Sequence, residues 1–593
     1  MPKRWVLPPR LSEEHFARFP TLPRLLVQLL HNRGICDPDQ MERFLECQPF
    51  ADTDPFQLRG MPQAVERLQA AIRAGELIAI FGDYDADGVT AAALLMQVLH
   101  ALGARLRSFP YLPDRFEEGY GLNKAALTAL AEEGVRLVVT VDCGARSVEE
   151  ACHAQALGLD LIITDHHMPG ETLPPAVALI NPKQPQCPYP FKQLAGVGLA
   201  FKLAQALLRA AERPVDVREE ALLDLVALGT VADMAPLMDE NRALVAAGLK
   251  VLNTAPRLGL RQLMAQAGVK PGTVEADTIG YILAPRLNAA GRLESAYTAF
   301  DLLVTADEAR AVALAARLES QNRERQALTD QMWEKARQAI LDDGAGRLLY
   351  LITDPDFNEG IVGLVAARLT EEFHRPTLVA HLGEEVTRGS ARSIPELHIT
   401  RALDECAALL ERYGGHSSAA GFTVRTANLA RLEAQLLEIA AREIGLSLPT
   451  PTLHIDAQLS LRAIHRRAVE DVLTRRMAGH DAPTHATAQR GLEVMEVLKR
   501  LAPFGCDNPK PVFLTRGLVV RRKQLVGSEG RHLKLTLHDG QQEWEAIGFR
   551  RANHHDEVGE RVDVAYRLDT DEYNGRCYLR LVIEDLRPSR GEG

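Results

Sequence analysis

Three apolar segments of the sequence end in side chains that carry carboxylate or imidazole groups. Residues 77–81, 135–141 and 160–164 are rich in Val, Ile and Leu and are typical of buried strands. The polar residues that follow them are Asp83, Asp85 and Asp87 after the first, Asp142 after the second, and Asp165, His166 and His167 after the third. The carboxyl ends of parallel strands meet at one edge of an open α/β sheet, so these side chains are expected to converge there.

The ligand types at this edge predict a metal site. Carboxylates suit hard divalent cations, and imidazole extends the preference toward manganese, iron or zinc. The acidic segment 83–87 would by itself be explained equally well as a solvated loop. That alternative does not explain why two further strands end in Asp142 and in the pair His166 and His167.

The first half of the chain alternates strands with helices between about residues 61 and 256. Further helices are expected at 89–102, 124–133, 148–157 and 196–211, and a further strand at 105–109. Strands separated by helices of about ten or more residues imply parallel pairing with right-handed crossovers. The proline-rich residues 173–190 are expected to be irregular, and an apolar helix at 221–231 leads to Asp233. The pattern predicts a doubly wound α/β domain.

Four short motifs carry a resemblance to a known family. They are Asp-Tyr-Asp-Ala-Asp-Gly at 83–88, Val-Asp-Cys-Gly at 141–144, Thr-Asp-His-His at 164–167 and Gly-Thr-Val-Ala-Asp at 229–233. In this order they resemble the consecutive motifs of the DHH phosphoesterases, and the whole chain is similar to the bacterial members that degrade single-stranded DNA.

The resemblance implies a centre of two divalent ions, Mn²⁺ or Mg²⁺, about 4 Å apart. The implied ligands are Asp85, Asp87, Asp142, His166 and Asp233. His167 is expected to contact the phosphate. Asp83 and Asp165 are expected to support the ligands from behind, since ligand groups usually need such partners.

Further residues are expected to contact DNA or its phosphates. They are Arg115 and Tyr120 in the loop 110–121, Arg286, Asn288 and Arg292 in the segment 284–293, and Ser390, Arg392, Gly415 and His416 in a later α/β unit. Guanidinium groups bind phosphate with two donors each. Alternatives are a merely solvated loop arginine and, for Gly-Gly-His at 414–416, a helix C-cap with a surface histidine.

The resemblance also organises the rest of the chain. The expected parts are a helical preface at 1–60, a DHH catalytic domain at 61–265, a connecting segment at 266–345, a DHH-associated α/β domain at 346–450 and an OB-type barrel at 451–593. Residues 306–343 lack Gly and Pro and predict an uninterrupted helix of roughly 55 Å. The Arg- and His-rich residues 463–490 are expected to be an insertion of unknown role.

The barrel is predicted from short strands joined by tight turns. The strands are expected at 512–513, 518–520, 532–537, 543–549, 561–568 and 578–583, with turns at Asp539-Gly540 and Asn574-Gly575. Three basic residues at 521–523 could attract phosphates while Phe513, Trp544 and Phe549 stack on bases. The alternative is that these aromatic residues form the barrel core.

Composition excludes several classes of protein. The eight cysteines form no Cys-x-x-Cys pair, which argues against a disulfide framework or a zinc ribbon, and Cys143 is expected to be a small strand-end residue rather than a nucleophile. The uncharged segment 88–104 is best explained as a core helix, and the start of the chain does not resemble a signal peptide. A cytoplasmic bacterial monomer is expected. The net charge of −11 does not argue against a nucleic-acid partner, because bound cations offset an acidic site.

The function implied by the resemblance is a single-stranded-DNA-specific 5′-to-3′ exonuclease. It would release 5′-mononucleotides in recombination and repair, beside a single-strand-binding protein and a RecQ-type helicase. One alternative is a pyrophosphatase or a phosphodiesterase for very short oligonucleotides, but such relatives are shorter and lack the barrel. A second is a binding scaffold that has lost its metal ligands, whereas every expected ligand is present in this sequence.

Overall fold

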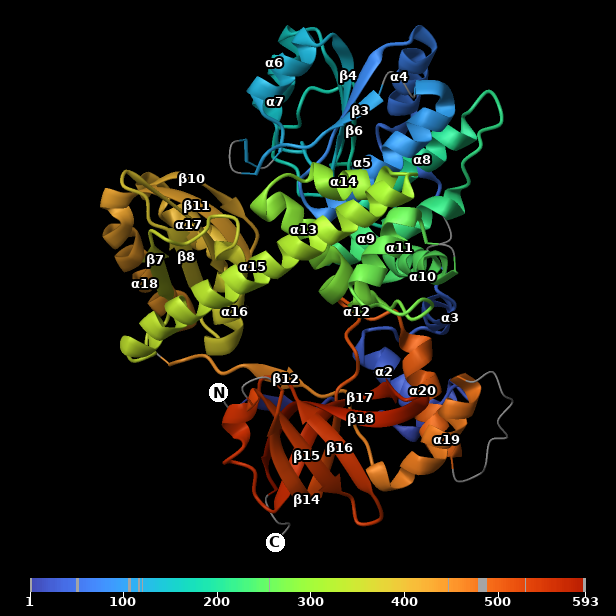
Figure 1. Ribbon diagram of the computed structural model, residues 1–593, viewed down its shortest axis with the longest axis vertical. Coiled ribbons are helices and arrows are strands. Elements are labelled where there is room, and N and C mark those ends of the chain that lie inside the picture. The colour runs from blue at the N-terminus through green and yellow to red at the C-terminus, as the bar shows by residue number, and fades with distance from the viewer. Residues whose placement is uncertain are drawn as a thin grey trace. The chain divides into compact units, whose positions relative to one another are not determined.

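The computed structural model of the chain describes residues 3–48, 53–104, 108–115, 118–119, 121–254, 256–445, 447–477, 488–527 and 530–589 (Figure 1). The chain forms two compact units. The larger unit, Cys47–Pro449, contains two α/β sheets. The other unit combines Met1–Glu46 with Thr450–Gly593.

A five-stranded parallel sheet forms the first domain of the larger unit. Its strands are β2 (Leu77–Phe81), β3 (Ser108–Tyr111), β4 (Val135–Val141), β5 (Asp160–Thr164) and β6 (Ala178–Ile180), in the order β3-β2-β4-β5-β6. The three strands predicted to carry the site are confirmed. The chain leaves β2 toward one edge and β4 toward the other, so the topological switch point lies between these two strands. The acidic segment 83–87 and Asp142 follow directly from them.

Strand β6 corrects one prediction. Residues 173–190 are predicted to be irregular, yet Ala178–Ile180 pairs in parallel with β5. The prolines lie on either side of these three residues, where they interrupt no ladder hydrogen bond.

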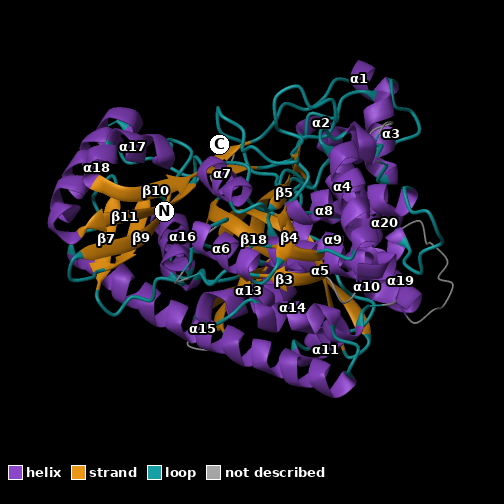
Figure 2. Cartoon of the chain, turned by 90° about the horizontal axis from the view of Figure 1, so that it is seen from above, coloured by secondary structure: helices purple, strands orange, loops and turns teal. Residues whose placement is uncertain are grey.

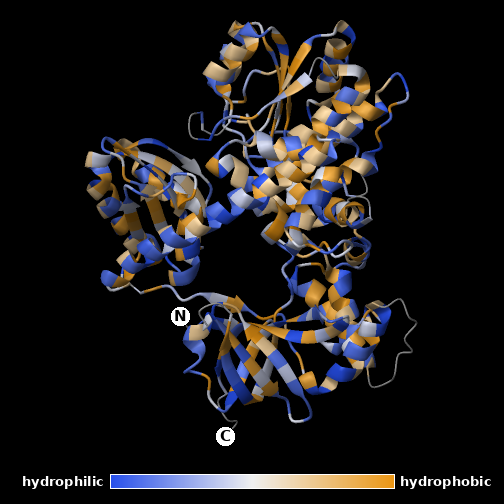
Figure 3. Cartoon of the chain, in the orientation of Figure 1, coloured by the Kyte–Doolittle hydropathy of each residue, from blue (hydrophilic) through white to orange (hydrophobic). Residues whose placement is uncertain are grey.

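Helices cover both faces of the parallel sheet, and the interior is mostly hydrophobic (Figures 1 and 3). The helices are α4 (Met61–Ala74), α5 (Ala86–Leu99), α6 (Lys124–Glu132), α7 (Val148–Ala156) and α8 (Gly196–Arg209). Ile78 and Ile80 pack with α4, α5 and α8, whereas Ala79 and Phe81 on the opposite face pack with α6 and α7. Ala86–Ala104 is long and apolar enough to cross a membrane, but 72% of it is buried in this core. It is a core helix, as predicted.

Helices also lead from this sheet to the second one. They are α9 (Leu223–Ala232), α10 (Asp239–Thr254), α11 (Leu258–Gln266), α12 (Ala276–Thr278), a π-helical turn η4 (Ile279–Leu283), α13 (Ala284–Leu293), α14 (Tyr297–Val304) and α15 (Glu308–Asp342). The 35-residue helix α15 packs on α11, α13 and α14 near its start and on α16 (Val362–Phe373) near its end. Figure 2 shows α15 running between the two sheets, as predicted.

The second sheet is mixed. Its strands are β7 (Tyr350–Asp354), β8 (Thr377–His381), β9 (Val386–Arg392), β10 (Leu410–Gly415) and β11 (Ala419–Arg425), in the order β10-β11-β9-β8-β7. α16 packs on β8 and β9 and reaches β7 at one face, and α17 (Ile399–Glu405) and α18 (Leu429–Ile444) cover the other face. Gly414 and Gly415 end a strand, so the alternative of a helix C-cap at Gly-Gly-His is wrong.

The smaller unit contains the predicted barrel. Its strands are β14 (Phe513–Val526), β15 (His532–His538), β16 (Glu543–Gly548), β17 (Arg561–Tyr573) and β18 (Arg576–Pro588), and pairing of β14 with β17 closes it. Phe513 of the predicted strand 512–513 and the whole predicted strand 518–520 belong to the single bent strand β14, while Val512 lies just before it. The predicted insertion contains helix α19 (Arg466–Met477), while residues 478–487 lie outside the described residues.

Two of the three barrel aromatics cannot stack on bases. Phe513 and Trp544 are fully buried, and Trp544 Nε1 donates a hydrogen bond to Asp539 Oδ2 at 2.9 Å. The alternative that they form the core is confirmed, because inward-facing positions of a small barrel are filled by side chains. Phe549 is 52% exposed and keeps the surface position that stacking would need.

A buried ion pair anchors α8 to α10. Lys202 Nζ lies 2.5 Å from Glu240 Oε1, and Tyr189 Oη donates to Glu240 Oε2 at 2.7 Å. Both charged side chains are almost fully buried. We expect Lys202→Met to destabilise the protein by about 3–5 kcal/mol, because Glu240 would remain buried without its cation. Thermal unfolding should show a smaller loss for the double variant Lys202→Met/Glu240→Leu; a larger loss would contradict this account.

Candidate metal centre and nucleotide cavity

The acidic segment after β2 turns directly into α5. Asp85 is the N-cap of this helix, and its Oδ1 accepts hydrogen bonds from the backbone N–H groups of Asp87 (2.9 Å) and Gly88 (3.1 Å). Capping by a carboxylate fixes the start of the helix. Asn288 supports the same corner, because its Oδ1 accepts from the N–H of Ala86 at 2.7 Å. The segment is therefore an ordered corner and not a solvated loop.

The N-terminus of α8 holds Asp87. The backbone N–H groups of Gly196 and Val197 donate to its two carboxylate oxygens at 2.7 and 2.8 Å. The helix dipole favours a negative charge at this position. The approach is close enough that a Cβ at Gly196 would lie 2.6 Å from the Cβ of Asp142. Gly196 has no role in our sequence-based prediction, although Gly-Val-Gly at the start of a predicted helix is a signal for close packing.

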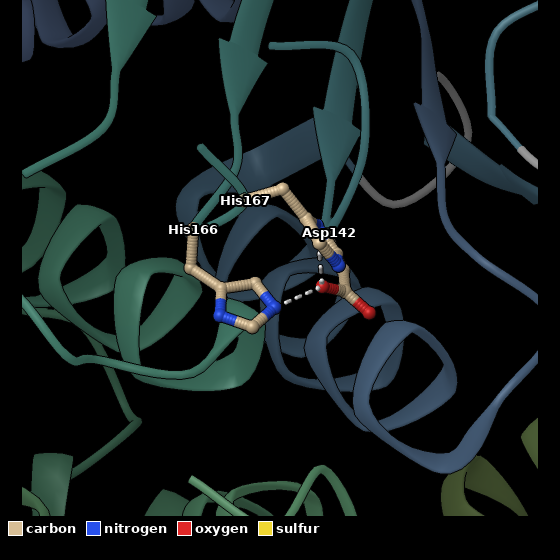
Figure 4. A group of neighbouring side chains, drawn as sticks. All are labelled: Asp142, His166 and His167. Atoms are coloured by element: carbon tan, nitrogen blue, oxygen red, sulfur yellow. Dashed lines mark ion pairs between the residues drawn. The ribbon is translucent and has the colours of Figure 1, made fainter. Parts of the chain in front are cut away.

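Asp142 lies at the centre of the ligand side chains. It follows β4 with a left-handed backbone conformation (φ 65°), which Asp tolerates better than most residues. His166 Nε2 lies 3.1 Å from Asp142 Oδ1, and His167 Nδ1 lies 4.0 Å from the same oxygen (Figure 4). His166 Nδ1 lies 3.8 Å from Oδ2 of Asp233, the C-cap residue of α9.

Three groups of side chains could each hold a cation, with ligand atoms within 4.8 Å of one another. They are Asp83, Asp85 and Asp142; Asp87, His166 and Asp233; and Asp142, His166 and His167. Asp83 and His167, for which we predict other roles, thus lie within reach of a cation. In the described structure, the buried atom Asp83 Oδ1 has no hydrogen-bond partner, and His166 Nε2 makes no hydrogen bond although it lies 3.1 Å from Asp142 Oδ1. Donors of this kind fit divalent cations such as Mn²⁺ or Mg²⁺.

The electrostatics of the carboxylates also favour a cation. Burial and then the charge of Asp85 raise the pKa of Asp87 to about 7. Burial and the charges of Asp87 and Asp85 raise the pKa of Asp233 to about 9, and the pKa of Asp142 is raised well above its usual range for the same reasons. Burial lowers the pKa of His166 to about 3, so this imidazole is neutral and suited to bind a metal.

Asp165 holds His167 in place. Its carboxylate accepts hydrogen bonds from the N–H of Ala145 (2.8 Å), the N–H of His167 (3.0 Å) and His167 Nδ1 (2.8 Å). Burial opposes a charge on His167, but its hydrogen bond to Asp165 and the nearby carboxylates raise its pKa overall. On its other side the His167 ring stacks against His416, with 6.0 Å between ring centroids. Asp165 has the supporting position that we predict for it.

Beyond His167 lies a cavity of about 760 Å³ between the parallel and the mixed sheet. Six arginines and three acidic residues line it, which favours an anionic ligand. The predicted residues among its lining are Arg115, Arg292, Ser390, Arg392, Gly415, His416 and His167. Arg146, Arg388 and Arg412 also line the cavity and were not predicted, because a single arginine in a strand or loop carries no distinctive signal.

Five of these arginines have no ion pair with any described carboxylate, whereas Arg388 Nη1 lies 3.5 Å from Glu359 Oε2. Arg115 lies over the ring of Tyr84 at 4.9 Å, Arg392 donates to Ser390 Oγ at 2.8 Å, and Arg292 donates to the carbonyl of Gly360 at 3.1 Å. Burial and the neighbouring arginines, Arg115 first, lower the pKa of Arg292 to about 9. A half-buried cation among other cations is stabilised by an anion such as phosphate.

The remaining predicted contacts lie elsewhere. Arg286 Nε donates to Glu319 Oε2 at 2.7 Å and ties α13 to α15, and Asn288 supports α5, so neither lines the cavity. Tyr120 lies outside the described residues. Cys143 is fully buried, and burial raises the pKa of its thiol well above the usual range, which argues against a nucleophile.

Comparison with known proteins identifies the family of the chain. Models of the DHH family N-terminal domain, the DHHA1 domain and the RecJ OB domain match residues 77–230, 345–442 and 480–585. The single-stranded-DNA-specific exonuclease RecJ of Bacillus subtilis is 37% identical over 95% of this chain and 68% of its own length. That of Escherichia coli is 34% identical over 96% of each chain. The chain belongs to the RecJ family.

Solved structures agree with this assignment. The crystal structure of RecJ from Thermus thermophilus in complex with Mn²⁺ superposes with a TM-score of 0.81 at 29% identity, over 99% of this chain and 80% of that one. A second RecJ exonuclease, bound to manganese, matches 65% of this chain and 95% of its own at 36% identity, with a TM-score of 0.57. The RecJ family therefore accounts for the DHH sheet, the DHHA1 sheet and the barrel.

Gly196→Ala is expected to weaken Mn²⁺ binding by on the order of 10- to 100-fold. The added methyl group would displace Asp142 and disrupt the hydrogen bonds from the start of α8 to Asp87. Gly198→Ala is a matched control on the same helix, where a Cβ would lie 3.3 Å from Leu194 Cδ2. Calorimetric titration of Mn²⁺ into the metal-free proteins measures the difference, with melting temperature as a check of folding. Equal affinities for the two variants would contradict this role of Gly196.

The metal-free protein is expected to lose stability as the pH rises from about 5 to 9. The folded-state pKa values of about 7 for Asp87 and about 9 for Asp233 exceed the ~4 of an unfolded carboxyl group, so the folded state binds extra protons in this window. Stability present at low pH is therefore lost as the pH passes each folded pKa.

Melting temperatures in EDTA measure this dependence, with Asp233→Asn as the control. The variant should lose less over the same window, and Mn²⁺ should restore the wild type more at high than at low pH. A wild-type melting temperature that rises with pH in EDTA, relative to the variant, would refute the assignment.

Proposed function

We propose that this protein is a metal-dependent exonuclease that degrades single-stranded DNA from its 5′ end and releases 5′-mononucleotides. One observation carries the proposal: the ligand groups around Asp142 adjoin, through His167, a cavity in which Arg115, Arg292 and Arg392 have no described carboxylate partner. Such a site suits a phosphodiester that is bound by cations on one side and guanidinium groups on the other. The relatives at 34–37% identity are named single-stranded-DNA-specific exonucleases.

Two divalent cations, Mn²⁺ or Mg²⁺, would be held by the predicted ligands. These are Asp85, Asp87, Asp142, His166 and Asp233. Cations at such a site lower the pKa of a bound water and stabilise the charge of the departing oxygen. The part of the protein is to keep the carboxylates in place, through the backbone N–H groups at the starts of α5 and α8.

His167 binds the reacting phosphate in this proposal. Asp165 holds its Nδ1, and its raised pKa keeps the ring protonated nearer to neutral pH, so the other ring nitrogen can donate to a phosphate oxygen. A charge-assisted hydrogen bond of this kind strengthens as negative charge develops on the oxygen. His166 stays neutral and serves only as a metal ligand.

The arginines on the other side of the cavity hold the 5′ end of the strand. Arg115, Arg292 and Arg392, with Ser390 beside Arg392, are the proposed partners of the terminal phosphate. Each cycle would leave a new 5′-phosphate that enters the same pocket. A cavity of about 760 Å³ accommodates a nucleotide but not the end of a duplex, which supports single-strand specificity.

The family resemblance also supports a cellular role. We infer that the protein works in DNA recombination and repair as a cytoplasmic monomer, beside a single-strand-binding protein and a RecQ-type helicase. The relatives named above are bacterial. The alternatives of a pyrophosphatase and of an inactive scaffold are disfavoured by the match to the RecJ OB domain and by the complete set of ligands.

Digestion of a long single-stranded DNA labelled at its 3′ end tests the function. In Mn²⁺ the wild type should shorten the labelled strand progressively and release mononucleotides, whereas Asp142→Ala should be slower by at least about 100-fold, because two of the ligand groups contain Asp142. Glu171→Ala, which removes an exposed carboxylate of the same domain, is the control. If the wild type leaves the strand intact but cleaves pyrophosphate or a dinucleotide, the proposal is wrong.

A further inference from the structure

Two glycines lie side by side on the face of the mixed sheet that lines the cavity. Gly414 of β10 and Gly421 of β11 are opposite each other in the antiparallel register, and Gly421 is in turn opposite Ser390 of β9. Residues directly opposite in such a pair lie on the same face. All three line the cavity. At Gly414 and Gly421 the sheet therefore presents a patch without side chains to the bound ligand.

The fold itself does not require either glycine. A Cβ at Gly414 or Gly421 would meet nothing within 4 Å, and neither residue has a positive φ. Two other glycines nearby differ. A Cβ at Gly415 would lie 2.2 Å from the carbonyl oxygen of Ala419, and one at Gly389 would lie 2.5 Å from Cζ of Phe422.

Glycine inside a strand costs stability and often marks a close approach of a ligand. Gly414 and Gly421 are therefore explained by a ligand that lies against them, and not by the packing of the fold.

The surroundings of the patch indicate which ligand fits. α16 packs mainly on β8 and β9 at this face and leaves β11 and β10 open to the cavity. Arg388 and Arg392 on β9 and Arg412 on β10 stand on the same face around the glycines. A flat apolar surface with guanidinium groups at its rim suits a ring system that carries phosphates.

The patch also lies next to the reacting centre. β10 leads from Gly414 to His416, whose ring stacks on that of His167. His167 in turn lies beside Asp142 in one of the three ligand groups. A nucleotide whose phosphate is bound at the metal centre can therefore place its sugar and base over the two glycines.

We propose that Gly414 and Gly421 form the floor on which the nucleoside of the terminal nucleotide lies. The inference rests on the proposed exonuclease function and names the part of the substrate that this surface receives. Because β11 pairs with strands on both sides, its backbone groups are engaged in the sheet and do not read the edges of a base. The floor holds any of the four bases by surface contact alone, which permits degradation regardless of sequence.

Gly421→Val tests the floor without disturbing the fold, since the site has room for the side chain and valine favours strands. Substrates are 5′-phosphorylated single strands that differ only in the terminal nucleoside: A, C, G, T or an abasic residue. The wild type should accept all four bases at similar rates. The variant should raise KM on the order of tenfold for the base-bearing ends, with a smaller effect on the abasic end. Gly414→Val should act in the same way.

Gly559→Val is the matched control, because a Cβ there also meets nothing within 4 Å and Gly559 lies outside the cavity lining. Unchanged KM for both floor variants would overturn the proposal, as would an equal loss on the abasic and base-bearing ends. A wild type that does not degrade single-stranded DNA would instead refute the proposed function. Mn²⁺ titration of Gly421→Val should match the wild type and so separates the floor from the metal centre.

Discussion

Repulsion among buried carboxylates is the constraint on which the rest of the larger unit depends. Asp83, Asp87 and Asp142 are nearly inaccessible to solvent and close to one another, and burial together with like charges raises the pKa of each. Such a cluster persists in a fold only if backbone donors hold it and cations compensate it. Helix α8 supplies donors to Asp87, and the neutral His166 adds a ligand without adding charge.

The topology of the parallel sheet explains why this cluster can exist at all. The switch point between β2 and β4 opens a crevice at the carboxyl ends of the strands, where no crossover helix covers the edge. Two acidic strand ends meet in that crevice, and β5 brings the histidines from the next position. The mixed sheet forms the other wall of the cavity, and its His416 ring stacks on that of His167.

Features that depend on residues close together in the sequence could be predicted, whereas features that depend on contacts between distant residues could not. Strands β2, β4 and β5 were predicted to the residue or nearly so, because apolar runs that end in polar residues identify buried parallel strands. The roles of Gly196, Asn288 and Arg286 were not predictable, since each depends on a partner far away in sequence: Asp87, Ala86 and Glu319. Trp544 shows the same limit, because the pattern of a barrel strand does not distinguish a core aromatic from a stacking one.

Each side of the cavity holds like charges that repel one another, and the two sides have opposite signs. On one side carboxylates repel one another, and on the other Arg292 lies half-buried near Arg115 and has a pKa lowered to about 9. Neither cluster neutralises the other, because Arg115, Arg292 and Arg392 make no ion pair with the ligand carboxylates in the described structure. A metal-bound phosphodiester relieves both at once: the cations compensate the carboxylates and the phosphate compensates the guanidinium groups. A ligand that brings both charges is therefore bound most favourably. A polyanion without metal compensates only the guanidinium groups, and a cation alone compensates only the carboxylates.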